Sequence, residues 1–403
     1  MHLIVIHHGM WGDSSHLLSV VNGIQKEIKD SVVHNCSVNS LFYSYQGIDC
    51  CGLRLKTDVL KFINSYNSDN RLPISQISFI GYSAGGLINR YCIGLLQTES
   101  FFDKVEPVHF ITIATPHLGT RVTSRTFSGR FFNRLMEIAV PIYAGRSGCQ
   151  MLLIDNHDSD REPLLVNLAG ADSPYIAGLA RFPHKYVYSN INNDNTVPYS
   201  TSSLSYSNKW KGSGAGAKGS NVLGYRHIRG CERIDLEYSP FQDQLATQRK
   251  MEEFSCGNAL YTFLLTVFLC PLVALQLLLL IVPLRIISLC YPHPAMDGLL
   301  PVSRSSSGDC GDTTDVELSP WIILRNLRAL DIYRVSVYIP GPHTHGLIIN
   351  RREAFATEGG SEVIRHIVSE VLPKKREETD ATEEPEPVAS NVSINTDDID
   401  VAS

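Results

Sequence analysis

Three residues that can together cleave an acyl bond occur in this chain in a recognisable order. Ser83 lies in Gly81-Tyr82-Ser83-Ala84-Gly85, the G-x-S-x-G pattern of a serine exposed by a sharp strand-to-helix turn. A serine hydroxyl is a weak nucleophile, so it needs a base within hydrogen-bond reach and an acid that orients the base. Asp194 and His345 follow later, and this order predicts attack by Ser83 on an acyl carbonyl.

The acid partner has rivals in the sequence. Asp194 follows a predicted strand at residues 186–191, which gives it a defined position, although Asn/Asp-rich loops are usually simple turns. Asp155, Asp158 and Asp160 lie in a polar loop outside any predicted strand. Because these three aspartates lack a recognised metal-ligand spacing, a solvated loop is preferred over a metal site.

Two histidines follow the last predicted strand, and either could be the base. His345 is preferred because Gly346 lets the backbone come close and the apolar residues 347–349 can anchor the loop. His343 stands against Pro342 and stays the alternative. Three further histidines are interpreted as structural groups: His7, His109 and His117.

The tetrahedral intermediate of acyl transfer carries a negative oxygen that hydrogen-bond donors must stabilise. The backbone N–H of Ala84, directly after the nucleophile, is one expected donor. The second expected donor is Met10, in the glycine-flanked loop after the first strand, with Gly9 as the alternative. No metal-ligand spacing or glycine-rich phosphate loop competes with this interpretation, so no cofactor is predicted.

The elements that must position these groups alternate between strand and helix. Such alternation predicts a parallel α/β sheet with right-handed crossovers, with Ser83 at the carboxyl end of a central strand. Strands are expected at residues 3–6, 41–45, 77–80, 108–114, 186–191 and 333–339, and helices at residues 47–64, 86–97 and 362–371.

A series of motifs resembles one family. HHGMWG, YQGIDCCGLRLKTDV, GYSAGG, ATPHLG, NNDNTVPY and HTHGLIINR look like the successive motifs of the putative serine esterase (lipase-like) family, and within it of fungal lipid-droplet phospholipases. The resemblance spans roughly residues 3–371 with a gap, and its most specific piece is the run at residues 47–55. It implies an α/β-hydrolase fold, a Ser83–Asp194–His345 triad and hydrolysis of acyl esters in lipids.

The elbow departs slightly from the family pattern. Tyr82 and Ala84 stand where histidine and leucine are more usual, and the first motif reads His-His-Gly. Neither change removes a reacting group. Tyr82 is expected to alter the shape of the acyl pocket.

The distribution of charge and the cysteines restrict which classes of partner and which cellular compartment are expected. The net charge of −6 lies in residues 374–403, which leaves 32 acidic and 32 basic residues for the body, so no nucleic-acid partner is predicted. This acidic tail lacks apolar periodicity and is predicted to be disordered. The ten cysteines form no C-x-x-C pair, and no signal-peptide core follows Met1. Free thiols and a catalytic body facing the cytosol are expected.

An apolar insertion lies between the predicted acid and base. Residues 257–284 carry no charge and could span a bilayer. One crossing would place Asp194 and His345 on opposite sides of the membrane, so none or an even number is required. Pro271 breaks the segment near its middle and favours a re-entrant hairpin, residues 257–290, in a membrane or in the monolayer of a lipid droplet. A buried core hairpin is less favoured, because core helices are rarely apolar all round.

The predicted organisation is a hydrolase core that an insertion divides. Residues 1–204 and 331–373 form an α/β-hydrolase core, with a lid-like region at 120–182. Residues 205–330 form the insertion with its flexible linker, and 374–403 form the tail. The predicted activity is a serine-dependent lipid acyl hydrolase (phospholipase or lipase) acting on phospholipids or glycerolipids at a lipid droplet or endoplasmic reticulum membrane. An acyltransferase or thioesterase with the same triad, or a non-catalytic lipid-droplet scaffold, remains open, as does the oligomeric state.

Overall fold

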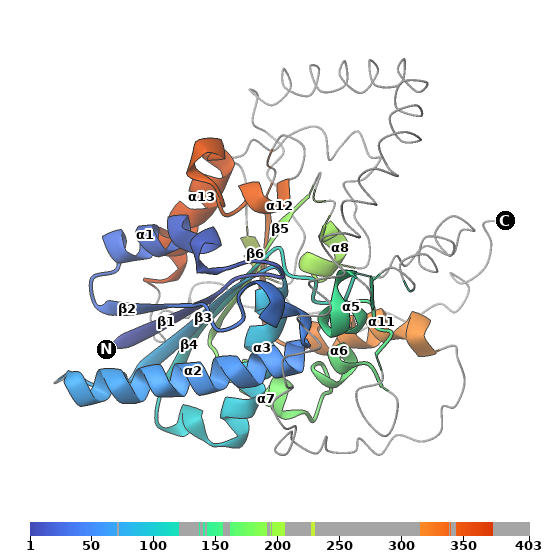
Figure 1. Ribbon diagram of the computed structural model, residues 1–403, viewed down its shortest axis with the longest axis horizontal. Helices are drawn as coiled ribbons and strands as arrows, with labels where there is room; N and C mark the ends of the chain where they lie inside the picture. The colour runs from blue at the N-terminus through green and yellow to red at the C-terminus, as the bar shows by residue number, and fades with distance from the viewer. Residues whose placement is uncertain are drawn as a thin grey trace, which may run out of the picture.

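A seven-stranded sheet forms the centre of the protein (Figure 1). The computed structural model describes residues 1–70, 72–120, 137, 140–141, 143–155, 162–191, 194, 196–205, 227–229, 315–337, 339 and 344–373. The strands are β1 (His2–His7), β2 (Ser31–Cys36), β3 (Gln76–Tyr82), β4 (Glu106–Ile113), β5 (His184–Asn190), β6 (His227–Arg229) and β7 (Tyr333–Val337).

The sheet has the order β2-β1-β3-β4-β5-β7-β6. The six strands from β2 to β7 in this order pair in parallel, and β6 runs antiparallel to β7. The predicted class, a mostly parallel α/β sheet flanked by helices, is therefore confirmed. Strand β3, which carries the elbow, lies inside the sheet between β1 and β4, so its carboxyl end opens between the loops that follow its neighbours.

Helices cover both faces of the sheet (Figure 1). One face is covered by α2, α3 and α7, and the other by α1 and α13, so apolar side chains of the strands are buried on both sides. The longer helices are α1 (Leu18–Glu27), α2 (Ile48–Asp69), α3 (Ala84–Thr98), α11 (Asp315–Arg328) and α13 (Glu358–His366). The shorter ones are α5 (Gly145–Met151), α6 (Leu164–Asn167), α7 (Pro174–Ala180), α8 (Tyr199–Ser202) and α12 (Thr344–Leu347).

The strand expected at residues 41–45 was wrong. Leu41–Tyr45 forms a 3-10 helix in which Leu41 has a positive φ of 53°, and the second strand of the sheet is Ser31–Cys36. The reason is position: β2 is an edge strand whose residues are mostly half-buried, so it tolerates polar side chains and lacks the continuous apolar run of its neighbours.

Several predicted segments fall partly or wholly outside the described residues. The apolar hairpin at 257–290 and the tail at 374–403 lie outside them entirely. Within the described residues, no helix combines the length and the apolarity needed to cross a bilayer. The predicted insertion, 205–330, does supply β6 and α11, and α11 buries Ile323, Leu324 and Leu327 in the core. The lid-like region contains α5, α6 and α7, and whether it moves stays a prediction.

Candidate active site

Ser83 occupies a strained turn between β3 and α3. Its φ of 54° and ψ of −130° lie outside the regions that non-glycine residues favour, as the sharp strand-to-helix turn of an elbow requires. The turn is held by the Ser83 N–H, which donates to the Ile113 carbonyl at 2.9 Å, and by the Thr115 hydroxyl, which donates to the Ser83 carbonyl at 2.8 Å. A Cβ on Gly85 would lie 2.4 Å from the His7 carbonyl oxygen, so the elbow has room only for glycine there.

The structure brings the three predicted triad residues together. His345 Nε2 lies 3.0 Å from Ser83 Oγ, and His345 Nδ1 lies 2.8 Å from Asp194 Oδ2. Asp194 Oδ1 accepts hydrogen bonds from the backbone N–H groups of Thr196 at 3.0 Å and Val197 at 2.8 Å, which orient the carboxylate. With Nδ1 donating to this carboxylate, the Nε2 lone pair of His345 faces the serine hydroxyl, as a general base requires.

Burial differs among the three side chains in a way that suits acyl transfer. The Asp194 side chain is 2% exposed and that of His345 is 15% exposed, while Ser83 is 8% exposed. The carboxylate is thus withdrawn from water beneath the imidazole, and the reacting side of the imidazole stays within reach of a substrate. An ion pair shielded in this way stabilises the imidazolium that forms during attack.

Of the rival residues, the structure describes Asp155. Asp155 Oδ2 accepts the Leu164 N–H at 3.0 Å, at the first turn of α6, so this carboxylate serves a helix end. Asp158, Asp160 and His343 lie outside the described residues.

The predicted oxyanion donors flank the serine. Ala84 is the first residue of α3, where a helix leaves its N–H groups without intrahelical partners. Gly9 packs against the serine so closely that a Cβ there would lie 2.6 Å from Ser83 Cβ, which brings the following Met10 to the same place. Among the described residues, neither the Ala84 nor the Met10 N–H has a hydrogen-bond partner. Their role in binding the oxyanion stays a prediction.

Tyr82 contacts the loop that carries the base, and its effect on the acyl pocket stays a prediction. Its hydroxyl donates to the His345 backbone carbonyl at 2.9 Å, and the two rings lie 5.0 Å apart. Tyr82 is 3% exposed, and burial raises the pKa of its hydroxyl well above the usual range. The tyrosine therefore ties the elbow to the loop that carries His345, and this contact runs between residues 263 positions apart.

We expect Tyr82→Phe to lower kcat about tenfold with little change in KM. The substitution removes one hydrogen bond, worth about 1 to 1.5 kcal/mol, that holds the His345 backbone, and it keeps the ring. Steady-state kinetics on a soluble short-chain ester would measure both constants. A kcat equal to that of the wild type would show that the loop is held without this bond.

The three histidines interpreted as structural are all buried. His7, at the end of β1, contacts the His8 carbonyl through Nδ1 and Asn39 through Nε2. His117 Nε2 lies 2.9 Å from the Thr112 hydroxyl, and burial holds its pKa well below the usual range. His109 lies on β4, and its Nδ1 lies 3.1 Å from the Ser78 hydroxyl.

Because His7 is buried, we expect the protein to lose stability in mild acid. Burial lowers the pKa of His7 from 6.5 to about 3. Below pH 6.5 this imidazole therefore binds a proton in the unfolded chain but not in the folded one. Its contribution is present above pH 6.5 and is lost as the pH falls, by about 2 kcal/mol at pH 5. Urea unfolding at pH 7.5 and pH 5 measures the total loss, to which His2 and His117 also contribute because burial lowers their pKa values too. His7→Asn should make this loss smaller by about 2 kcal/mol. An equal loss in His7→Asn would assign the effect to other groups.

The structural role of residues 47–55 becomes visible only in the tertiary structure. Asp49 is fully buried, forms an ion pair with Arg146 and accepts from Gln150 Nε2 at 3.1 Å, so the start of α2 is tied to α5. A Cβ on Gly52 would lie 2.6 Å from the ring of Tyr91, so this glycine lets α2 approach α3. Because the partners of Asp49 lie about 100 residues away, no local pattern identifies them.

Arg54 extends this network towards the oxyanion loop. Its guanidinium donates to Asn39 Oδ1 at 2.6 Å and to Gln46 Oε1. Asn39 in turn contacts His7, two residues before Gly9. The family-like run thus supports the backbone from which the Met10 N–H is presented.

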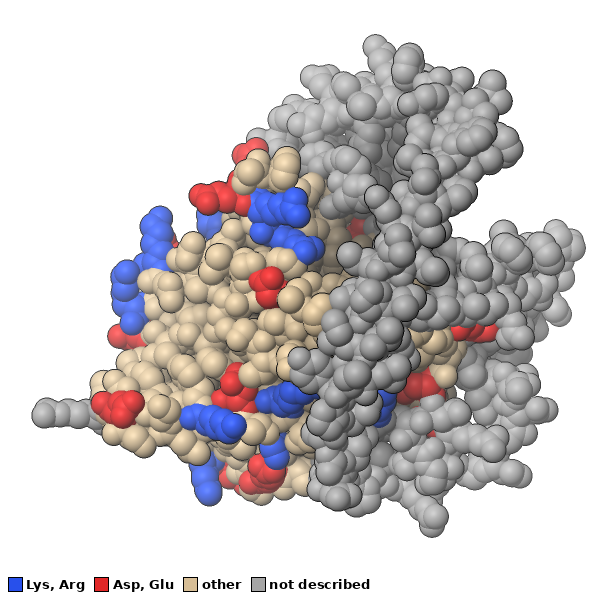
Figure 2. Space-filling model, viewed as in Figure 1, with Lys and Arg blue, Asp and Glu red and all other residues tan. Residues whose placement is uncertain are grey.

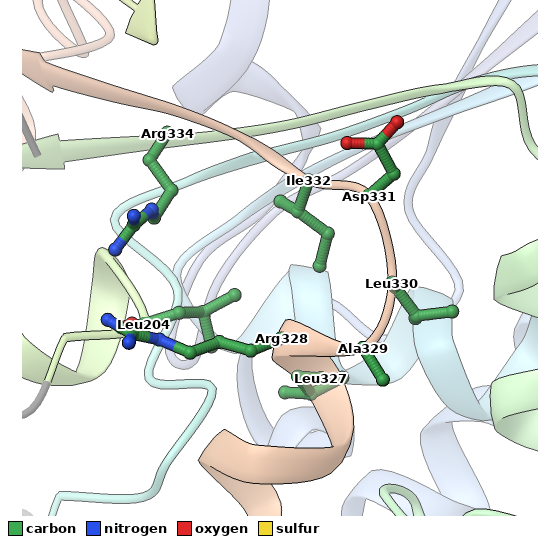
Figure 3. Close-up of a pocket in the computed structure, with 8 residues that line it drawn as sticks. All are labelled: Leu204, Leu327, Arg328, Ala329, Leu330, Asp331, Ile332 and Arg334. Carbon is green, nitrogen blue, oxygen red and sulfur yellow. Dashed lines mark hydrogen bonds between the residues drawn. The ribbon is translucent and has the colours of Figure 1, made fainter. Parts of the chain in front are cut away.

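A hollow of about 320 Å³ is lined largely by the end of α11 and the start of β7 (Figure 3). It surrounds the start of β7, whereas the loop carrying His345 follows the end of that strand. Arg328 and Arg334 are among its lining residues, and Arg328 Nε donates to the Leu204 carbonyl at 3.1 Å. It is therefore separate from the triad. On the face in Figure 2, basic and acidic side chains are intermixed over the described surface, so neither sign dominates it.

Comparison with known proteins identifies relatives over about half of the chain. The family model described as "Putative serine esterase (DUF676)" matches residues 1–206. A putative lipase of Schizosaccharomyces pombe is 27% identical over 52% of this chain and 27% of its own length. The putative lipase ROG1 of Saccharomyces cerevisiae is 32% identical over 50% of this chain and 28% of its own length. The chain thus spans less than a third of the length of these relatives.

Solved structures also match, at low similarity. A putative cell surface hydrolase from Lactobacillus plantarum is 18% identical with a TM-score of 0.29, and the match covers 50% of this chain and 74% of that one. Phospholipase PlaB from Legionella pneumophila is 14% identical with a TM-score of 0.31, over 50% of this chain and 41% of that one.

Proposed function

Because the chain belongs to the Putative serine esterase family, we propose that it is a lipid acyl hydrolase that uses Ser83, His345 and Asp194. Its mostly parallel sheet has the α/β-hydrolase fold, with the elbow serine after β3, the acid after β5 and the histidine after β7. The observation that carries the proposal is the continuous contact from Ser83 Oγ through the imidazole to Asp194, at 3.0 and 2.8 Å.

The proposed reaction has two halves. Ser83 Oγ attacks the ester carbonyl while His345 Nε2 takes the hydroxyl proton, and the Ala84 and Met10 N–H groups stabilise the oxyanion. His345 then gives this proton to the leaving alcohol, which departs and leaves an acyl-enzyme. Water, deprotonated by the same nitrogen, attacks the acyl-enzyme and releases the fatty acid. No cofactor is required for these steps.

Exposed apolar side chains on the oxyanion loop and on the segment bonded to it support a lipid acyl substrate. Trp11, directly after Met10, is 44% exposed, and Leu41 and Tyr43 are 49% and 40% exposed. The Leu41 N–H donates to the Gly12 carbonyl at 2.9 Å, which joins this apolar group to the oxyanion loop. Exposed aromatic and aliphatic side chains on the loops that adjoin a candidate site favour an apolar ligand.

The proposed location is a lipid droplet or the endoplasmic reticulum membrane, with the catalytic body facing the cytosol. The support is the uncharged run at 257–284, together with the requirement that Asp194 and His345 meet on one side of a membrane. Alkaline carbonate extraction tests this: the intact protein should stay with the membrane pellet. Release into the supernatant would contradict a membrane-embedded hairpin.

The activity is tested by release of fatty acid from a substrate panel. Purified full-length protein, with Ser83→Ala as the matched control, would be given phospholipid, mono-, di- and triacylglycerol, and an acyl thioester. We expect Ser83-dependent release from at least one oxygen ester of a lipid. Release from the thioester alone, or acyl transfer to an added alcohol in place of hydrolysis, would replace the proposal by a thioesterase or an acyltransferase. No Ser83-dependent product from any substrate would favour a non-catalytic role.

A further inference from the structure

Three side chains of metal-binding type meet at the edge of the sheet, outside the active site. His34 and Cys36 are two residues apart on β2 and therefore project from the same face of the strand. Asp58 reaches them from α2, which packs on that face. The imidazole Nε2, the thiol Sγ and a carboxylate oxygen all lie within 4.8 Å of one another.

The surroundings hold this cluster in place. His34 Nε2 lies 2.7 Å from Asp58 Oδ2, and the imidazole stacks on Phe62, one helical turn after Asp58, with ring centroids 4.2 Å apart. Cys36 is fully buried, while the side chains of His34 and Asp58 are 18% and 24% exposed. One side of the cluster is thus closed by the core, and the other side is open to water.

A contact between His34 and Asp58 alone does not require the Cys36 thiol beside it. The contact between His34 and Asp58 would by itself link β2 to α2. The Cys36 thiol makes a weak hydrogen bond to the His34 carbonyl at 3.7 Å and also interacts with the Asp58 side chain. A buried sulfur directed towards an imidazole and a carboxylate supplies the third ligand of a mixed N, S and O set.

We propose that His34, Cys36 and Asp58 bind one Zn²⁺ ion, with water as the fourth ligand. Zn²⁺ takes this mixture of ligands in tetrahedral geometry at about 2.0 to 2.3 Å, which places ligand atoms roughly 3.5 Å apart. The widest separation in the cluster must therefore shorten by roughly 1 Å. On binding, the thiol S–H bond breaks, the sulfur coordinates the ion and the proton leaves to solvent.

Such a site would clamp the edge of the sheet. Among the described strands, β2 has one neighbour, β1, and the ion would link it by coordination bonds to the middle of α2. Its function is structural, since β1 separates β2 from the strand that carries the elbow. Metal removal should therefore lower the melting temperature of the protein while Ser83-dependent hydrolysis, assayed below that temperature, persists.

The test uses the full-length protein stripped of metal with a chelator and titrated with Co²⁺ or Zn²⁺. Co²⁺ bound to a thiolate gives a near-ultraviolet charge-transfer band that oxygen and nitrogen ligands do not give. We expect this band at one equivalent, its loss on addition of Zn²⁺, and its absence in Cys36→Ser. Cys149→Ser removes a partly exposed thiol outside this cluster and should leave the band unchanged.

A second variant keeps the test independent of the buried cysteine. His34 is partly exposed, so His34→Gln should fold, and we expect it to weaken Zn²⁺ binding by at least about 100-fold. Asp58→Asn should also weaken binding. A wild-type protein without the thiolate band, a band that survives in Cys36→Ser, or unchanged Zn²⁺ affinity in His34→Gln would each overturn the proposal.

Discussion

Replacing Ser83 by alanine is expected to lower kcat for ester hydrolysis by about 10⁵- to 10⁶-fold, the range found when the nucleophile of other serine hydrolases is removed. The Ser83 hydroxyl lies 3.0 Å from His345 Nε2, and among the described residues it is the hydrogen-bond partner of that nitrogen. Without it no acyl-enzyme forms, and the His345–Asp194 pair has no nucleophile to activate.

The same variant should fold normally. Alanine keeps the Cβ that already fits the turn, and the backbone N–H of residue 83 still donates to the Ile113 carbonyl. A fluorophosphonate probe should label the wild type and leave Ser83→Ala unlabelled, with melting temperatures within a few degrees of each other. Labelling of the variant, or retained hydrolysis, would place the nucleophile elsewhere.

Replacing Asp194 by asparagine is expected to lower kcat by about 10⁴-fold. Asp194 Oδ2 accepts a hydrogen bond from His345 Nδ1, with 2.8 Å between the two atoms, which leaves the Nε2 lone pair facing the serine. An amide at this position can donate to Nδ1 instead and so favours the tautomer that carries its proton on Nε2. The asparagine also lacks the negative charge that stabilises the imidazolium.

Asp155→Asn is the matched control for this prediction. Asp155 was the alternative acid within the described residues, and its carboxylate accepts the Leu164 N–H at the start of α6. We expect kcat within about twofold of the wild type and a loss of stability of at most about 1 kcal/mol. Equal losses of kcat in the two variants would mean that the acid role had been assigned to the wrong loop. Kinetics on a soluble ester and thermal unfolding measure both effects.

The reacting residues were accessible to sequence reasoning because each follows a recognisable strand. Ser83 comes after an apolar run that is buried on both faces of the sheet, β5 ends four residues before Asp194, and His345 follows the largely buried strand β7. Strand β2 was not accessible in this way, because an edge strand is only half-buried and its polar residues resemble a loop. The apolar run at residues 41–45 was mistaken for it, although a positive φ at Leu41 sets that segment in a 3-10 helix.

The sequence by itself determined the alternation of strands and helices, the elbow at Ser83 and the order of its partners. These follow from apolar periodicity and from glycines that a tight turn requires, both of which are local properties. Only the tertiary structure decided the contact of Tyr82 with the His345 backbone, the pairing of Asp49 with Arg146 and the meeting of Cys36 with Asp58. Each of these contacts joins residues on different elements, so it depends on how the helices pack on the sheet, which no local pattern records.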